Sequence, residues 1–253
     1  MSSCISNKKL IYLQEAEGAP IQIGDSLYVY NQPEYRLQYN DIIDVQITTE
    51  LENINDLFDG GNRQLNVAAR AGSQGGGDIY YMTGHSINRG GFIELPLLGQ
   101  IQVAHLTLEE AKQHIENKVR SLANDEVFVR VKLGGIRYST MGEFRNPGKF
   151  VVLQDRMTIF EAISLSGDLT HLAKRDEILL IRQNPDGVQL QRLNLMDRNI
   201  IQSPYFFIQP NDQLYAEPMR VRELGTGENA AQSISLLITS LSVVALVLNL
   251  ITR

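Results

Sequence analysis

The sequence predicts an α+β protein, with two small α+β domains followed by one C-terminal transmembrane helix. Three observations support this class. Alternating strand patterns recur along the chain, two capping boxes open helices between them, and no charged residue occurs between Glu228 and Arg253. We expect a lead-in over residues 1–34, a first domain over 35–135, a second domain over 136–221, a linker over 222–229 and the helix over 230–252.

The first domain opens with a turn at Asn40 and Asp41, after which apolar residues at 43, 45 and 47 alternate as in a half-buried strand. Residues 52–91 hold nine of the chain's 20 glycines and few apolar residues, which predicts a long insertion between strands.

Order resumes at residues 91–103, which predict two short strands around Pro96 and Gly99. Thr107 and Glu110 have the spacing of a capping box, and apolar residues at helical spacing continue to about Ala123. Valines at 127, 129 and 131 then alternate as a further strand.

The second domain shows the same mixture. Residues 141–150 predict a strand, a Pro-Gly turn and a second strand, and Thr158 with Glu161 forms another capping box, for a helix that stops at Gly167. Residues 184–187 predict a hairpin turn. Its strands, 177–182 and 188–193, are followed by a final pair at 205–208 and 214–216.

The charge-free tail has the length of a membrane span. At about 1.5 Å per residue, residues 229–252 would extend roughly 36 Å as a helix, enough to cross the hydrocarbon core of a bilayer. One side is purely apolar and would face lipid: Ile234, Leu237, Ile238, Leu241, Val244, Ala245 and Leu248. The opposite side would face a lumen or neighbouring helices, and it collects Ser233, Ser235, Thr239, Ser240, Ser242 and Asn249.

The two different faces favour a ring of such helices. A simple anchor is surrounded evenly by lipid and needs only one kind of face, and a single helix cannot line a pore. A tail anchor and a buried core helix are the alternatives.

Composition narrows the remaining possibilities. The net charge of −6 argues against a nucleic-acid binder, and the single cysteine excludes an intrachain disulfide. That cysteine, Cys4, follows small residues as the lipidated cysteine of a bacterial lipoprotein does, although the apolar region of a signal peptide does not precede it. It is either a lipidation site or an ordinary thiol.

Signs of catalysis are weak. The four histidines show no metal-ligand spacing, no nucleophile-elbow pattern frames a serine, and residues 72–77 lack the Lys-Ser/Thr of a phosphate loop. Asp41 and Asp44 have the spacing of turn and strand-edge residues. We therefore expect no enzymatic activity, no catalytic residue, no cofactor and no metal site.

The order of these motifs resembles the outer-membrane polysaccharide export family of Gram-negative lipoproteins. Residues 35–47 resemble its opening Y-x-[IL]-x-x-x-D-x-[IL]-x-[IV] pattern. Residues 92–111 resemble its G-x-[IL]-x-[LF]-P-x-[IL]-G-x-[IV]-x-[VA]-x-G-x-T-x-x-E-[AL] pattern, except that His105 stands where glycine is usual. Residues 141–217 resemble the soluble-ligand-binding β-grasp (SLBB) module of that family, except that Asp168 stands where a second glycine is common.

The resemblance implies a homo-oligomeric ring, often an octamer, of lipoproteins with periplasmic bodies, lipid-anchored at Cys4 in the outer membrane. Its C-terminal helices would form an α-helical barrel for capsule or exopolysaccharide. It also implies an inner-membrane polysaccharide co-polymerase as partner, sometimes with a tyrosine autokinase. The chain departs from larger members in having one clear β-grasp module and a helix with little charge. The alternative is a membrane-anchored periplasmic glycan-binding adaptor without a pore.

Overall fold

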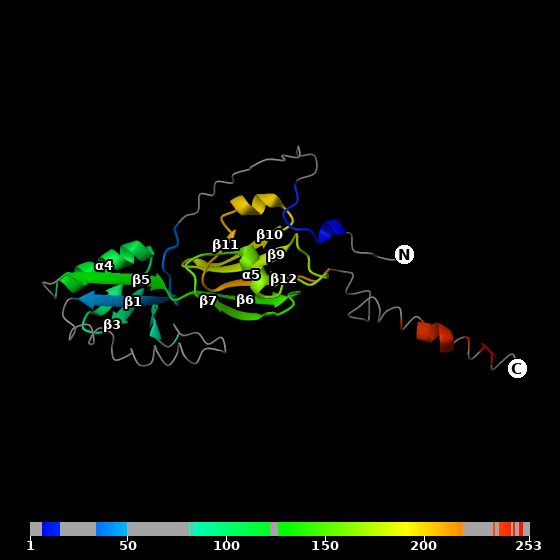
Figure 1. The fold of residues 1–253 in the computed structure, drawn as a ribbon, viewed down its shortest axis with the longest axis horizontal. Helices are drawn as coiled ribbons and strands as arrows, with labels where there is room; N and C mark the ends of the chain where they lie inside the picture. The colour runs from blue at the N-terminus through cyan, green and yellow to red at the C-terminus, as the bar shows by residue number, and fades with distance from the viewer. Residues whose placement is uncertain are drawn as a thin grey trace.

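The computed structural model describes residues 7–15, 34–49, 81, 83–121 and 126–219, and, in the C-terminal segment, residues 235, 238–243, 245, 248 and 249. Figure 1 shows two domains of mixed helix and strand lying side by side along the long axis of the molecule. The mixed fold class predicted from the sequence is confirmed.

A three-stranded antiparallel sheet forms the centre of the first domain. Strand β1, Ile42–Thr49, lies between β2, His85–Ser86, and β5, Val127–Leu133. The β1 strand begins where the sequence predicts it. The predicted insertion over 52–91 extends too far, because β2 pairs with β1 and the buried Ile87 donates its backbone N–H to the carbonyl oxygen of Asp41 at 2.9 Å.

A hairpin and a helix complete this domain. Strands β3, Phe92–Leu95, and β4, Gly99–Gln102, pair antiparallel, and helix α4, Leu108–Arg120, packs against β5. The capping box of α4 is confirmed, since Glu110 N–H donates to Thr107 Oγ1 and Thr107 N–H donates to Glu110 Oε2. The helix buries an apolar stripe of Ala111, Ile115 and Val119.

A five-stranded mixed sheet forms the second domain, in the order β10-β9-β12-β6-β7. Its strands are β6, Ile136–Gly142; β7, Gly148–Val152; β9, Ile178–Asn184; β10, Gly187–Leu193; and β12, Asp212–Ala216. The two hairpins, β6-β7 and β9-β10, lie on either side of β12, which runs parallel to β6 and antiparallel to β9. The predicted hairpin turn at 184–187 is confirmed, whereas β6 begins at Ile136, earlier than its predicted start at residue 141.

The parallel pairing of β12 with β6 depends on Gly142. This residue has a φ of +86°, and a Cβ there would lie 2.2 Å from the carbonyl oxygen of Ala216. Only glycine can combine that conformation with so close an approach of the last strand.

Shorter elements complete the second domain. Helix α5, Ile159–Leu165, follows β8, Met157–Thr158, and its predicted capping box is confirmed by reciprocal Thr158 and Glu161 hydrogen bonds. Strand β11, Phe207–Ile208, pairs with β8, and the 3-10 helix η2, Arg198–Gln202, precedes it. The predicted strand at 205–208 is therefore shorter than expected.

The N-terminal segment lies on the second domain, although the first domain follows it in sequence. After the 3-10 helix η1, Asn7–Lys9, the Tyr12 hydroxyl donates to Asp168 Oδ1 at 2.6 Å, and Gln14 forms an isolated parallel bridge with Asp197. Tyr12 also packs edge-on against Phe160. The lead-in thus carries tertiary contacts that its lack of periodicity did not predict.

The described C-terminal residues are helical and exposed, including the apolar side chains of Ile238, Leu241, Val243 and Leu248. Thr239 and Ser242 donate their hydroxyls back to the carbonyl oxygens four residues earlier, at 2.9 and 2.7 Å. Among the described residues, no helix is both long enough and apolar enough to cross a membrane. The rest of the predicted span lies outside the described residues.

Candidate functional site

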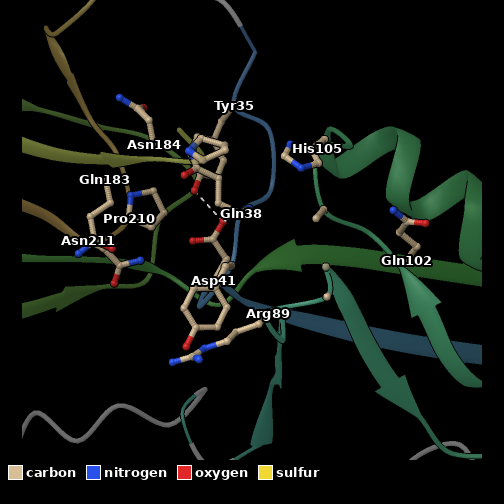
Figure 2. Close-up of a pocket in the computed structure, with 15 residues that line it drawn as sticks. Tyr35, Gln38, Asp41, Arg89, Gln102, His105, Gln183, Asn184, Pro210 and Asn211 are labelled. Carbon is tan, nitrogen blue, oxygen red and sulfur yellow. Dashed lines mark hydrogen bonds between the residues drawn. The ribbon is translucent and has the colours of Figure 1, made fainter. Parts of the chain in front are cut away.

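A polar cavity of about 330 Å³ lies at the junction of the two domains. Its lining residues come from the segment before β1, from the two ends of the β3-β4 hairpin and the loops beside them, from the end of β9 and the turn after it, and from the β11-β12 connection: Tyr35, Gln38, Tyr39, Asp41, Arg89, Gly90, Gly91, Gln102, Ala104, His105, Gln183, Asn184, Pro185, Pro210 and Asn211. Figure 2 shows these side chains around the opening. Both domains therefore supply polar side chains to this cavity.

The first domain contributes a tight turn at residues 38–41. Asn40 has a φ of +71°, in the left-handed region that asparagine tolerates better than most residues. Asp41 Oδ2 accepts the backbone N–H of Gln38 at 2.8 Å, which closes the turn. The predicted turn at Asn40 and Asp41 is confirmed, and it places Asp41 at the edge of the cavity.

The carboxylate of Asp41 is almost fully buried, with 2 % of the residue exposed. The Tyr35 hydroxyl donates to Oδ2 at 2.6 Å, drawn as a dashed line in Figure 2, while Oδ1 has no hydrogen-bond partner. Burial raises the pKa of Asp41 to about 6, although the Tyr35 and Gln38 hydrogen bonds lower it. A carboxylate with one unsatisfied oxygen therefore borders the cavity.

The second domain contributes a turn of the same design at residues 209–212. Asn211 has a φ of +67°, and Asp212 Oδ2 accepts the backbone N–H of Gln209 at 2.8 Å. Arg182 donates to both carboxylate oxygens of Asp212, at 3.0 and 2.7 Å, and to the carbonyl oxygen of Phe207 at 2.9 Å. Burial raises the pKa of Asp212, and the guanidinium beside it opposes that rise.

Sequence reasoning did not single out this pair of turns as a site, although a signal was present. Both turns read Gln-x-Asn-Asp, once at the start of the first domain and once before the last strand of the second. A short motif repeated in two different domains could have indicated that the turns share a structural role. Nothing in the sequence brings them to one cavity, because that depends on how the domains pack.

An aromatic ring and a guanidinium also border the cavity, and Arg89 lies below Asp41 in Figure 2. Arg89 lies over the Tyr39 ring, 6.0 Å from its centroid, and 55 % of Tyr39 is exposed. The amide side chains of Gln38, Gln183 and Asn184 add groups that both donate and accept hydrogen bonds. This combination suits a ligand with several hydroxyls and an apolar face.

The position at which the sequence departs from the export family in the first domain also lies here. His105 has a φ of +67°, the conformation that glycine adopts readily. The turn therefore keeps its left-handed backbone without glycine. Its backbone is held by two hydrogen bonds, from His105 N–H to Leu37 O at 2.8 Å and from Arg36 Nη1 to His105 O at 2.6 Å.

The site residues predicted from the sequence lie elsewhere. Cys4 is outside the described residues, as are Ser233, Ile234, Leu237 and Val244 of the tail. The described tail residues are not among those that line the cavity. Within the described ranges, no group of histidine, cysteine, aspartate and glutamate side chains could hold a metal ion.

Comparison with known protein families finds a similarity in the first domain. Residues 29–132 match the family described as polysaccharide biosynthesis/export protein, and the match ends within β5, at residue 132. No curated protein matches the chain significantly. Residues 29–132 are therefore similar to the polysaccharide biosynthesis/export protein family, and this similarity supports a role in making or exporting a polysaccharide.

Proposed function

We propose that the protein is the subunit of an oligomeric outer-membrane translocon that exports a capsular or extracellular polysaccharide. The observation that carries this proposal is the family match over residues 29–132, which covers the first domain. The protein performs no covalent chemistry in this role. It supplies a polar path for a polymer that is too large and hydrophilic to cross lipid.

The second domain fits the SLBB β-grasp module expected to follow an export domain. A hairpin, a helix and a second hairpin are followed by β12, which enters the sheet centre parallel to the first strand, β6. Asp168, which replaces a common glycine of the module, has a φ of +72°, so it keeps the backbone that glycine would adopt. Modules of this kind would form the periplasmic vestibule of the ring.

The positions of the chain ends support attachment to one membrane. The 3-10 helix η1 and the chain that leaves β12 both lie on the side of the second domain away from the first domain (Figure 1). Lipidation at Cys4, shortly before η1 in the sequence, and a helix after Met219 would then hold the same end of the body against the outer membrane. The first domain would project into the periplasm, toward an inner-membrane co-polymerase with or without a tyrosine autokinase.

The C-terminal helices would close into the barrel. Exposed Ile238 and Leu241 would meet lipid, and small residues on the flank, among them Ser240, Ser242 and Ala245, would allow neighbouring helices to approach closely. Because Thr239 and Ser242 already donate their hydroxyl protons to their own helix, these two side chains would offer a glycan acceptor oxygens. An octameric ring is the stoichiometry that the family resemblance implies.

Leu241→Arg tests the barrel. A charge on the lipid side at mid-membrane costs roughly 2.5–3.5 kcal/mol per helix on insertion scales, repeated around the ring, so surface polysaccharide should be lost. Leu165→Arg is the matched control, since Leu165 is an exposed leucine of α5 in the body. Normal surface polysaccharide in the Leu241→Arg strain would contradict the barrel.

The cavity between the domains favours a second candidate, a glycan-binding adaptor without a pore. Particle images of the detergent-solubilised protein separate the two, together with membrane fractionation and a Cys4→Ser variant. A translocon subunit should form rings in the outer membrane and depend on Cys4. An adaptor should be a monomer or small oligomer in the inner membrane and tolerate the substitution.

A further inference from the structure

The free oxygen of Asp41 requires a partner. Its Oδ1 is buried without a hydrogen bond, in a residue that is 2 % exposed, whereas Oδ2 is satisfied by Tyr35 and Gln38. In Figure 2 the free oxygen, Oδ1, points away from Tyr35, toward the part of the cavity bordered by Pro210 and Asn211. A buried, unsatisfied carboxylate oxygen is energetically unfavourable and accepts a hydrogen bond readily from a hydroxyl.

The charges around the cavity favour an uncharged ligand. Asp41 and Arg89 contribute opposite charges to the lining, so the two charges do not select strongly for an anion or a cation. Arg89 is also engaged with the Tyr39 ring at 6.0 Å. The other polar side chains are mainly amides, which recognise hydroxyl groups without requiring a charge.

Flat apolar surfaces accompany these polar groups. Tyr39 is 55 % exposed, and Pro185 and Pro210 line the second-domain side of the cavity. A sugar ring has an apolar face of C–H groups and an edge of hydroxyls, so it can pack on such surfaces while its hydroxyls reach the amides and the carboxylate.

The volume limits the ligand to a short unit. At about 330 Å³ the cavity lies at the small end of the range for ligand sites. It can hold one or two sugar rings and not a longer folded segment of glycan.

We propose that this cavity between the domains is a binding site for one or two uncharged sugar units, held by hydrogen bonds from sugar hydroxyls to Asp41 and to the amide side chains. That the sugar belongs to the transported polymer rests on the proposed export function; the site itself rests on the cavity. Because both domains supply lining residues, an occupied site links the first domain to the second and fixes their relative orientation.

Binding of simple sugars to the full-length protein in mild detergent tests this site. The probes are glucose, galactose and N-acetylglucosamine, with glucuronate as a charged counterpart, followed by saturation-transfer NMR and titration. At least one neutral sugar should bind at least as tightly as glucuronate, because the opposite charges of Asp41 and Arg89 give a carboxylate no net advantage. Tighter binding of glucuronate than of every neutral probe, or no binding of any neutral probe, would overturn the proposal.

Variants locate the site. Asp41→Asn replaces one carboxylate oxygen by an N–H donor while the other oxygen can still close the turn, and affinity should fall about 10-fold or more, as expected for losing a charged hydrogen bond. Tyr39→Ala removes an exposed ring and should weaken binding similarly, which keeps the test valid if Asp41→Asn misfolds. Asp155→Asn and Phe128→Ala, exposed residues outside the cavity, are the matched controls.

The outcomes separate this proposal from the proposed function. Sugar binding that depends on Asp41 and Tyr39, in a protein whose Leu241→Arg variant still exports, would retain the site and reject the barrel. Binding unchanged in both cavity variants would reject the site and leave the export role standing.

Discussion

Two turns of the same design border the cavity between the domains, one at residues 38–41 and the other at residues 209–212. In each, an asparagine in the left-handed region precedes an aspartate whose Oδ2 accepts the backbone N–H three residues earlier, at 2.8 Å. Their side-chain partners differ. Asp212 forms a two-pronged ion pair with Arg182, whereas Asp41 has a tyrosine hydroxyl and one unsatisfied oxygen.

The difference separates a structural carboxylate from one available to a ligand. The charge of Asp212 is matched by a buried guanidinium, which in turn binds the carbonyl oxygen of Phe207 and so ties β9 to β11. The hydrogen bonds from Tyr35 and Gln38 and the nearby charge of Arg137 favour the ionised form of Asp41, and its free oxygen borders a cavity large enough for a ligand. Two turns with the same local design therefore have different roles because their neighbours differ.

Removing the charge of Asp212 should have the largest effect. Asp212→Asn leaves Arg182 buried without a counter-charge, and breaking a buried ion pair costs about 3–5 kcal/mol. Urea unfolding of the full-length protein at pH 7.5, followed by tyrosine fluorescence, measures the loss. Asp41→Asn is the matched variant and should destabilise by no more than about 1 kcal/mol. Equal losses would show that the two turns are not distinct.

The pH dependence of stability should reveal the burial of Asp41. Its pKa is raised from 3.8 to about 6 on folding, so between about pH 4 and pH 6 the folded protein binds a proton that the unfolded chain does not. The contribution of Asp41 to the free energy of unfolding therefore increases by roughly 3 kcal/mol as the pH falls through that window. Unfolding curves of wild type and Asp41→Asn at pH 8 and pH 4 should show the wild type gaining that amount relative to the variant. Parallel pH profiles would contradict the assignment.

Tyr35→Phe tests the hydrogen bond that satisfies Asp41. Loss of the 2.6 Å hydrogen bond leaves Oδ2 with the Gln38 N–H alone, which should destabilise the protein by about 1–3 kcal/mol at neutral pH. The same change should raise the pKa of Asp41 further, because the tyrosine hydroxyl lowers it in the wild type. The carboxyl carbon chemical shift of Asp41, followed with pH, measures that change, and an unaltered titration would exclude the Tyr35 contribution.

Substitutions of the two left-handed asparagines should have the smallest effects on stability, and these effects should be equal in the two turns. Asn40→Ala and Asn211→Ala each place a residue without a polar side chain in the left-handed region, at a cost of about 1 kcal/mol. Asn40→Gly and Asn211→Gly are the controls and should be nearly neutral, because glycine adopts this conformation freely. Thermal melting compares the four variants. Unequal costs of the two alanine variants would show that the backbones of the turns are strained differently.

Much of the local structure was predictable from the sequence. Helices α4 and α5 begin at their predicted capping boxes, and the hairpin turn at 184–187 and strand β1 lie where the patterns indicate. These features depend on residues within four positions of each other, so local propensity and hydrogen bonding suffice. The errors lie at β2, β6 and β11, whose ends are set by pairing with distant strands.

The cavity and the N-terminal contacts were not predictable. Tyr12 and Asp168 are 156 residues apart in sequence, and their hydrogen bond depends on a segment crossing to the second domain. The lining of the cavity likewise joins residues from the start of the first domain to residues near the end of the second. The spacing of apolar residues along the sequence does not predict contacts between segments so far apart.

Short-range patterns in the sequence were enough to predict the main helices and strands, the resemblance of the first domain to the export family and the turn at Asn40 and Asp41. The folded structure was needed to show that β12 enters between two hairpins, that Asp212 meets Arg182, and that Asp41 keeps an oxygen free beside a cavity. Burial and pairing of a charge depend on which distant side chains fill the space around it, and that space exists only once the domains have packed.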